Sequence, residues 1–112
     1  YCRGFIMGVR AFKKPTPEGL LTKSVRRLLN VAGILHYKAW QGPMSEPGIS
    51  DIIGCYKGRF IAIELKAGKG VASSAQLEFI RRVNEAGGIG FVAYDLDTVI
   101  EKLGLGDRFL IR

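Results

Sequence analysis

The sequence predicts an α/β domain in which a mixed β-sheet is flanked by helices, in the order α-β-β-β-α-β-α. Residues 17–32 and 73–86 repeat their apolar side chains with helical spacing, whereas residues 49–65 and 89–94 are apolar runs typical of strands. A helix that carries one strand to the next in the same sheet forms a crossover, which makes the sheet mixed. The 112 residues have the length of one domain.

The first helix is predicted from its two ends and from its apolar stripe. Thr16 is a favoured N-cap, Pro17 a favoured first residue, and Gly33 suits the position just after the helix. Glu18 falls on the apolar stripe, one turn from the helix start, which is an unusual place for a carboxylate. The stripe consists of Leu21, Val25, Leu28, Leu29 and Ala32.

The segment between the two long helices predicts three strands. Residues 34–40 form the first strand, and residues 41–48, with two Pro and two Gly, form a loop. The two strands after this loop pair as a hairpin around Lys57 and Gly58, because Gly supplies the positive φ that such turns need.

The rest of the chain predicts a second helix, a strand and a short last helix. Ser73 caps the second helix, and Gln76, three residues later, completes a capping box. A fully buried strand follows at residues 89–94, and Asp97 caps a last helix over residues 98–103. The buried face of the second helix is predicted to consist of Leu77, Ile80, Val83 and Ala86.

The hairpin brings two acidic residues together at one end of the sheet. Its turn pairs Tyr56 with Arg59, and counting outward from that pair places Asp51 directly opposite Glu64. Directly opposed residues have Cβ atoms about 5 Å apart on one face of the sheet. Strand alternation then puts Lys66 on the same face as Glu64. Two opposed and partly buried carboxylates repel each other, so their repulsion must be offset.

Two ways of offsetting this repulsion are open from the residues alone. One carboxyl group could take a raised pKa. A divalent cation such as Mg²⁺ is the better candidate, because both acids can then stay charged and hard cations prefer oxygen ligands. Lys66 is close enough to hold an attacking water or to stabilise a pentavalent phosphate. A phosphodiester is the substrate class that needs a metal, an ammonium group and a basic surface together.

Each of these residues also has a purely structural interpretation. Asp51 could only cap the strand that follows the loop, and Glu64 and Lys66 could belong to the solvated face of an edge strand. Both faces of the hairpin are apolar in the middle, however, and charges gather at one end only, which weighs against this interpretation. One face carries Ile53, Phe60 and Ala62 together with Glu64, and the other carries Ile52, Ile61, Ile63 and Leu65.

The charge of the chain favours a polyanionic partner. The formal net charge of +7 fits nucleic acid or an acidic membrane surface, and it also fits a solvated basic surface. Residues 1–15 form an acid-free basic arm that could lie along phosphates. The packed domain is predicted over residues 16–104, and a tail over residues 105–112. No apolar run reaches the ~18 residues that a membrane helix needs.

The pattern D-x₁₂-E-x-K formed by Asp51, Glu64 and Lys66 resembles that of the PD-(D/E)XK nucleases. After a helix that carries an acid, the chain continues with GISDIIG, FIAIELKAG, SSAQLEFIRRVNEAGG and GFVAYD. This order is similar to the VRR-NUC family, in the small stand-alone form found in phages and prophages. The resemblance covers roughly residues 16–103 and implies a restriction-endonuclease-like core. It departs from the family at Ser50, where the family usually has Pro.

The resemblance implies a role for each residue of the motif. Asp51 and Glu64 would bind the catalytic Mg²⁺ or Mn²⁺, with the main-chain carbonyl of Leu65 as a further ligand. Lys66 would position or activate the attacking water. Glu18 would complete the acidic cluster, directly or through a water, which matches its place on the apolar stripe.

Further residues are predicted to contact DNA. Gln76 lies where the family carries a glutamine near the active site, although its place in the capping box explains it as well, and Gln41 could line the same cleft. Residues 68–70, GKG, predict a mobile basic loop over phosphate. Basic pairs on the helices are either solvated faces or DNA contacts. The predicted contacts are Lys13, Lys14, Arg26, Arg27, Gln41, Lys69 and Gln76.

Other chemistries lack the residues that they need. His36 is the only histidine, so neither a histidine-based zinc site nor a Ser-His triad is available. The GKG segment lacks the spacing of a Walker loop, and no nucleotide cofactor is expected. The two cysteines, Cys2 and Cys55, form no disulfide framework and predict a reduced, intracellular setting.

Together these observations predict a Mg²⁺- or Mn²⁺-dependent DNA endonuclease in the cytoplasm of a bacterial or phage-infected cell. The resemblance implies cleavage of branched DNA, at Holliday junctions or flaps. A junction needs two cuts, so a homodimer is expected, with no membrane partner. The alternatives are an inactive DNA-binding module with a nuclease-like fold and a basic structural or interaction protein. Asp51, Glu64 and Lys66 favour the enzyme, since a relic has no physical reason to keep opposed carboxylates.

Overall fold

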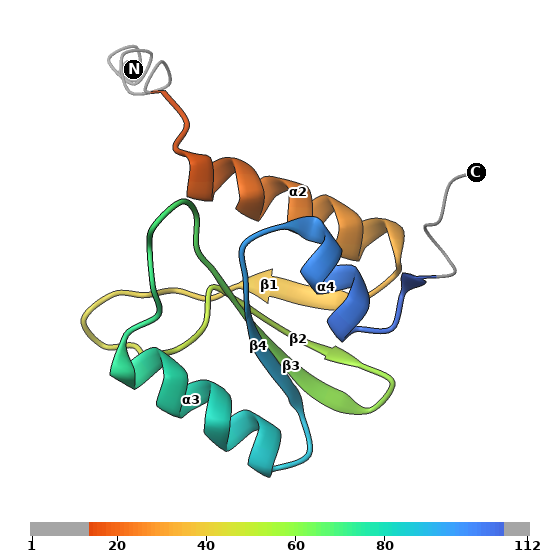
Figure 1. The fold of residues 1–112 in the computed structure, drawn as a ribbon. Helices are drawn as coiled ribbons and strands as arrows, with labels where there is room; N and C mark the ends of the chain where they lie inside the picture. Colours follow the sequence, from red (N-terminus) through yellow and green to blue (C-terminus); the bar gives the residue numbers. More distant parts are fainter. Residues whose placement is uncertain (1–13, 107–112) are drawn as a thin grey trace, which may run out of the picture.

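The computed structural model describes residues 14–106 and has the predicted element order (Figure 1). The elements are α2 (Pro17–Val31), β1 (Leu35–Lys38), β2 (Ile52–Tyr56), β3 (Arg59–Leu65), α3 (Ser74–Glu85), β4 (Ile89–Ala93) and α4 (Leu96–Lys102). The strands form one sheet in the order β1-β2-β3-β4. The first three are antiparallel, whereas β4 runs parallel to β3, because α3 carries the chain back between them. The predicted α/β class with a mixed, helix-flanked sheet is confirmed.

The two sides of the sheet are covered by different helices. Helices α2 and α4 lie next to each other on one side, which we call the α2 face, and α3 covers the other, which we call the α3 face (Figure 1). Because strand residues alternate, the hairpin contributes to both sides, as predicted. The α2 face carries Ile52, Ile61, Ile63 and Leu65, and the α3 face carries Ile53 and Ala62.

Helix α2 begins and ends as the sequence predicts. Thr16 Oγ1 accepts a hydrogen bond from the backbone N–H of Gly19 at 2.9 Å. At the other end Gly33 has a φ of 73°, and the N–H of Ile34 donates to the carbonyl of Leu29 at 2.9 Å. This bond is typical of a helix end closed by a glycine in the left-handed conformation. The caps therefore fix the length of the helix locally.

The predicted buried face of α3 is wrong at both of its ends. Ile80 and Val83 are buried, but Leu77 is 51% exposed, and Ala86 is exposed as well. Phe79 packs against the sheet instead. A helix has 3.6 residues per turn, so positions spaced only by three drift off one face. The observed face is spaced by three and by four residues, which keeps it on the sheet.

Helix α4 begins earlier than predicted. Its N-cap is Asp95, not Asp97, because the Asp95 carboxylate accepts the backbone N–H of Thr98 at 2.9 Å. Asp97 lies in the first turn, where a carboxylate interacts favourably with the helix dipole. Leu105 is fully buried, so the core continues past residue 104, where the predicted domain ends.

The hairpin between β2 and β3 confirms the predicted register. Lys57 and Gly58 form the turn with φ values of 52° and 78°, and Tyr56 pairs with Arg59. Positive φ at both central residues is the geometry that matches the twist of two hairpin strands.

Parts of the chain that carry predictions lie outside residues 14–106. These parts include Lys13, most of the predicted arm, most of the predicted tail and Cys2. Cys55 is a free, exposed cysteine. No helix within residues 14–106 combines the length and the hydropathy needed to cross a membrane.

Candidate active site

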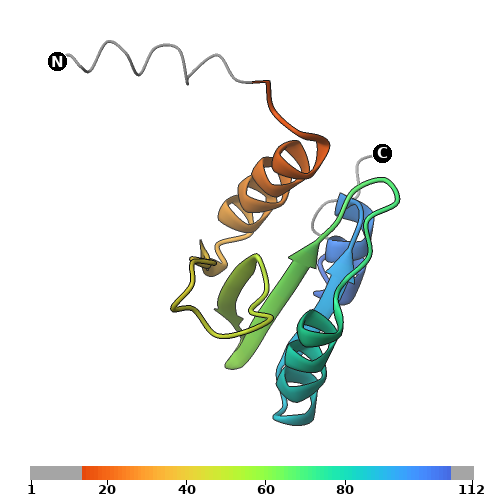
Figure 2. The ribbon, with the colours of Figure 1, turned by 90° about the vertical axis from the view of Figure 1, so that its left-hand side faces the viewer.

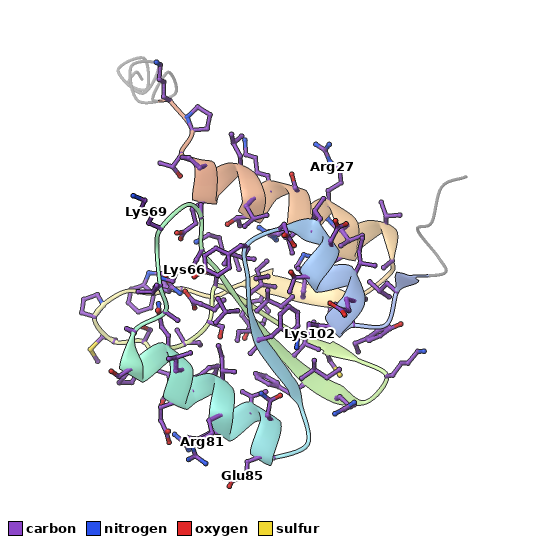
Figure 3. The ribbon with its side chains drawn as sticks, in the orientation of Figure 1. Arg27, Lys66, Lys69, Arg81, Glu85 and Lys102 are labelled. Atoms are coloured by element: carbon purple, nitrogen blue, oxygen red, sulfur yellow. The ribbon has the colours of Figure 1, made fainter. Side chains whose placement is uncertain are left out.

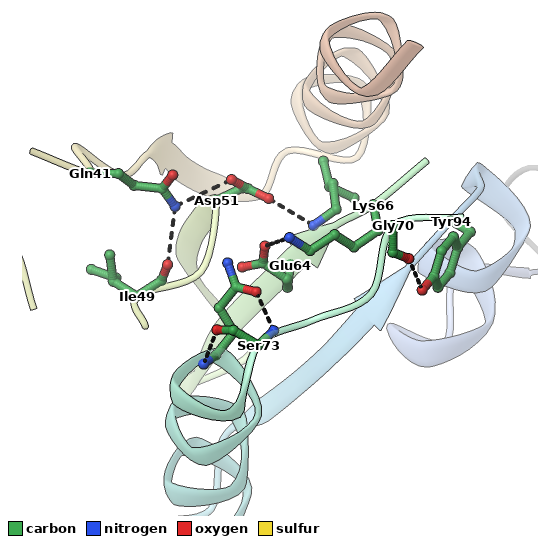
Figure 4. A network of polar contacts seen from close by, with 10 residues as sticks. Gln41, Ile49, Asp51, Glu64, Lys66, Gly70, Ser73 and Tyr94 are labelled. Carbon is green, nitrogen blue, oxygen red and sulfur yellow. Dashed lines mark hydrogen bonds and ion pairs between the residues drawn. The ribbon is translucent and has the colours of Figure 1, made fainter. Parts of the chain in front are cut away.

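Asp51, Glu64 and Lys66 meet at the end of the sheet where β3 stops (Figure 4). Glu64 is the penultimate residue of β3 and is 1% exposed, while Asp51 precedes β2 and is 8% exposed. Ile52 pairs with Ile63, so extending this register by one residue places Asp51 opposite Glu64. The predicted opposition of two carboxylates agrees with the structure.

Hydrogen bonds hold the Asp51 carboxylate in one orientation. Its Oδ2 accepts the backbone N–H of Leu65 at 2.8 Å, and its Oδ1 accepts Nε2 of Gln41 at 3.3 Å. The same Gln41 amide donates to the carbonyl of Ile49 at 3.1 Å (Figure 4). Because the backbone of β3 makes the strongest of these contacts, Asp51 is tied directly to the strand that carries Glu64.

Lys66 pairs with Glu64 from the first position after β3. Its Nζ lies 3.4 Å from Glu64 Oε2, and its side chain is 17% exposed. The backbone N–H of Lys66 donates to the carbonyl of Ala93 at 3.1 Å, which continues the pairing of β3 with β4. The ion pair of the side chain and the hydrogen bond of the backbone together hold the Lys66 ammonium group beside the carboxylates.

The carboxyl group of Glu64 has a strongly shifted pKa. Its pKa is raised from 4.5 to about 7, chiefly by burial and then by the negative charge of Asp51, whereas the positive charge of Lys66 lowers it. Oε1 of Glu64 is buried without a hydrogen-bond partner among residues 14–106. Buried polar atoms normally have partners, so an unpartnered carboxylate oxygen here indicates that the site receives a ligand.

The donors of this site suit a hard divalent cation. Mg²⁺ is commonly bound by one or two protein carboxylates, with water and substrate oxygens completing the shell. Asp51 and Glu64 supply such a pair, and the backbone of Leu65 lies beside them through its bond to Asp51. A cation would also supply the missing partner of Glu64 Oε1. The residues present therefore fit the group that the sequence predicts.

Glu18 does not complete a three-carboxylate cluster in the part of the chain that the structure describes. No group of three or more His, Cys, Asp or Glu side chains there is arranged to hold a metal. Glu18 is half-buried in the first turn of α2, and α2 packs on the opposite face of the sheet from Glu64. The family resemblance implied that Glu18 joins the acidic cluster directly or through a water, and the described residues contain no direct three-residue group. A contribution through a water stays a prediction.

The two predicted glutamines line one groove beside the carboxylates. The groove has a volume of about 350 Å³ and lies between the loop of residues 41–49 and the start of α3. Gln76 Oε1 accepts the backbone N–H of Ser73 at 2.8 Å, which confirms the predicted capping box. A larger groove of about 900 Å³ lies between the hairpin turn and the end of α3, and neither groove is lined by Asp51 or Glu64.

The predicted basic contacts are spread over several surfaces. Lys69 projects outward from the loop that follows β3, and Arg27 points away from the site on the outer side of α2 (Figure 3). Arg26 lies near β1, where its Nε is 3.5 Å from Nε2 of His36. Lys14 is exposed just before α2. Of these four cations, only Lys69 lies in the loop that directly follows the site residue Lys66.

Two further residues shape the site without having been predicted from the sequence. Gly48 has a φ of 75°, and a Cβ atom there would lie 2.2 Å from the carbonyl oxygen of Ala75. Only glycine therefore allows the loop to pack on α3. Tyr94 donates its hydroxyl to the carbonyl of Gly70 at 2.6 Å. The sequence gives no signal for this contact, because it joins residues 24 positions apart.

Comparison with known proteins adds no family to this geometry. No family model matches the chain, and no curated protein matches it. The chemistry of the site is consequently inferred from its own donors: a buried carboxylate pair, an ammonium group at 3.4 Å and an oxygen without a partner in the described part of the chain.

Proposed function

We propose that this protein is a Mg²⁺- or Mn²⁺-dependent endonuclease that hydrolyses phosphodiester bonds in DNA. The observation that carries the proposal is the buried pair Asp51 and Glu64, with Lys66 held 3.4 Å from Glu64. Two ionised acids at such burial lower stability, and Lys66 supplies only one of the two positive charges that would balance them. The resemblance of the motif to PD-(D/E)XK nucleases supports the same conclusion.

Each residue of the site has a defined role in this proposal. Asp51 and Glu64 would hold the cation together with the main-chain carbonyl of Leu65. The bound cation supplies an activated water and neutralises charge on the phosphate. Asp51 is orientated by Leu65 N–H and Gln41, so its position does not depend on the substrate. Lys66, fixed by Glu64 and by the backbone of β4, would hold the attacking water or face the phosphate charge.

The substrate class follows from charge, and its shape from the family resemblance. A net charge of +7 favours association with a polyanion. We further propose that the substrate is branched DNA, a Holliday junction or a flap, cut by a homodimer in the cytoplasm of a bacterial or phage-infected cell. Two cuts at a two-fold junction need two sites, and one chain contains one motif.

The proposal is tested by incubating the protein with linear, flap and four-way DNA, with Mg²⁺, Mn²⁺ or EDTA. We expect cleavage only with the metal, and most cleavage on the branched substrates. Glu64→Gln is the matched control, because it keeps the shape of the side chain and removes the charge. Cleavage that persists in EDTA or in Glu64→Gln contradicts the proposed site, and binding without cleavage favours the inactive DNA-binding module.

A further inference from the structure

The loop that follows Lys66 contains a tight turn with an outward-facing lysine. The backbone N–H of Gly70 donates to the carbonyl of Ala67 at 3.0 Å, and Gly68 has a φ of 58°. Positive φ at this place in a turn favours glycine. Lys69 is exposed at the turn and projects outward (Figure 3). Two views at right angles place the tip of the loop at the end of the molecule where α2 begins (Figures 1 and 2).

Tyr94 ties this turn to the sheet. It follows β4, and its hydroxyl donates to the carbonyl of Gly70 at 2.6 Å (Figure 4). Within residues 14–106, this is the one hydrogen bond that joins residues 67–72 to a distant strand or helix. Tyr94 is 45% exposed. Packing of its ring therefore does not by itself hold the loop in this position.

The same turn lies over the side chain of Lys66. A Cβ atom at Gly70 would lie 3.8 Å from Cδ of Lys66 and 3.3 Å from the carbonyl oxygen of Ala67. The turn therefore packs on the aliphatic part of the lysine whose Nζ pairs with Glu64 at 3.4 Å. A single hydrogen bond from Tyr94 thus restrains the turn that covers Lys66 and exposes Lys69.

We propose that Tyr94 is a positioning residue that presents Lys69 to the DNA backbone next to the cleaved phosphate. This inference rests on the proposed function and extends it to a residue outside the motif. A turn that is already held in place loses less conformational entropy when it contacts a phosphate. The ligand of the turn is the sugar-phosphate backbone, because most protein–DNA hydrogen bonds go to phosphate and sugar and an exposed lysine pairs with phosphate charge.

The test compares DNA affinity at several salt concentrations, with Ca²⁺ in place of Mg²⁺, for Tyr94→Phe, Lys69→Ala and the double variant. Tyr94→Phe removes only the hydroxyl, and we expect a roughly two- to tenfold weaker affinity. Lys69→Ala should weaken binding and flatten the salt slope by about one unit. The double variant should bind like Lys69→Ala alone, because Tyr94 acts through that lysine.

Tyr37→Phe is the matched control, since Tyr37 is 60% exposed on β1 and its hydroxyl makes no hydrogen bond within residues 14–106. It should bind DNA like the wild type. Wild-type affinity in Tyr94→Phe overturns the inference, and so does a loss that adds fully to that of Lys69→Ala. A wild type that binds without cleaving, with the non-additive pattern intact, overturns the nuclease and leaves the role of Tyr94 standing. A wild type that cleaves while Tyr94→Phe binds normally overturns the role of Tyr94 alone, and one that neither binds nor cleaves DNA overturns both.

Discussion

Leu65 and Glu64 are neighbours in β3 and are equally buried. Burial of Leu65 stabilises the fold, whereas burial of the Glu64 carboxylate costs free energy. Leu65 is 0% exposed on the α2 face, and Glu64 is 1% exposed on the α3 face. Leu65 packs within the main hydrophobic core, where burying such a side chain stabilises the fold by roughly 1.5–3 kcal/mol. Glu64 has one oxygen without a partner within residues 14–106 and a pKa raised to about 7.

The difference shows that burial alone does not identify what a residue is for. On the α2 face, the apolar side chains continue to the end of the hairpin next to the site, where Ile52 and Leu65 are buried. On the α3 face, the apolar residues give way to Asp51 and Glu64 at one end. The first face stabilises the fold, whereas the end of the second holds unfavourable burial that a ligand would relieve.

Substitutions of Leu65 and Glu64 should give the largest difference in stability and in cleavage between the two faces. Leu65→Ala should lower the free energy of unfolding by about 2–5 kcal/mol, because it opens a cavity in the core. Glu64→Ala should leave that free energy unchanged or raise it, and should lower the cleavage rate on the order of 10³-fold. Urea denaturation and a gel cleavage assay measure the two effects. Unfolding of Glu64→Ala, or cleavage near that of the wild type, would remove the contrast between the faces.

The raised pKa of Glu64 predicts how pH changes stability without metal. The folded state holds the proton up to about pH 7, whereas the unfolded chain releases it near 4.5. The unfolded state thus binds fewer protons within this window, and the free energy of unfolding falls as pH rises through it. The loss by pH 8 should be on the order of 3 kcal/mol in EDTA.

Glu64→Gln sharpens this test, because a neutral amide cannot titrate. Its urea midpoint should change little between pH 5 and pH 8, and Mn²⁺ should raise the midpoint of the wild type at pH 8 but not that of the variant. An equal pH dependence in both proteins would mean that Glu64 is not the group that titrates.

Lys66 lies on the functional end of the α3 face but is not expected to be a metal ligand. Lys66→Ala should lower turnover on the order of 10²-fold, with little change in the Mn²⁺ concentration that gives half-maximal rate. Lys102→Ala, which removes an exposed cation of α4, serves as the control (Figure 3). Weaker metal binding with an intact rate at saturating Mn²⁺ would reverse the role assigned to Lys66.

The smallest expected effect concerns the basic residues of the arm that precedes α2. Neutralising Lys13 and Lys14 should flatten the dependence of DNA affinity on salt by roughly one unit per lost phosphate contact. The change should be equal for linear and branched DNA, because phosphate contacts carry no sequence information. An unchanged slope would make the arm unnecessary for binding, and a loss confined to branched DNA would make it a reader of DNA shape.

Features whose partners are close along the chain were predictable from the sequence. The Thr16 and Ser73 caps and the register around Lys57 and Gly58 each involve residues only a few positions apart. Counting the register outward from this turn places Asp51 opposite Glu64, so the centre of the candidate site was predictable. Local hydrogen bonding and turn geometry suffice for these features, because they need no other element to be in place.

Tertiary structure decided what depends on elements that are far apart in sequence. Periodicity indicates that one side of a helix is apolar, but not which face of the sheet that side covers. For this reason the packing of α2 on the face opposite Glu64 could not be predicted. The raised pKa of Glu64 and the bond from Tyr94 to Gly70 likewise arise only when α3 and β4 pack beside β3, since desolvation and long-range contacts exist only in the assembled fold.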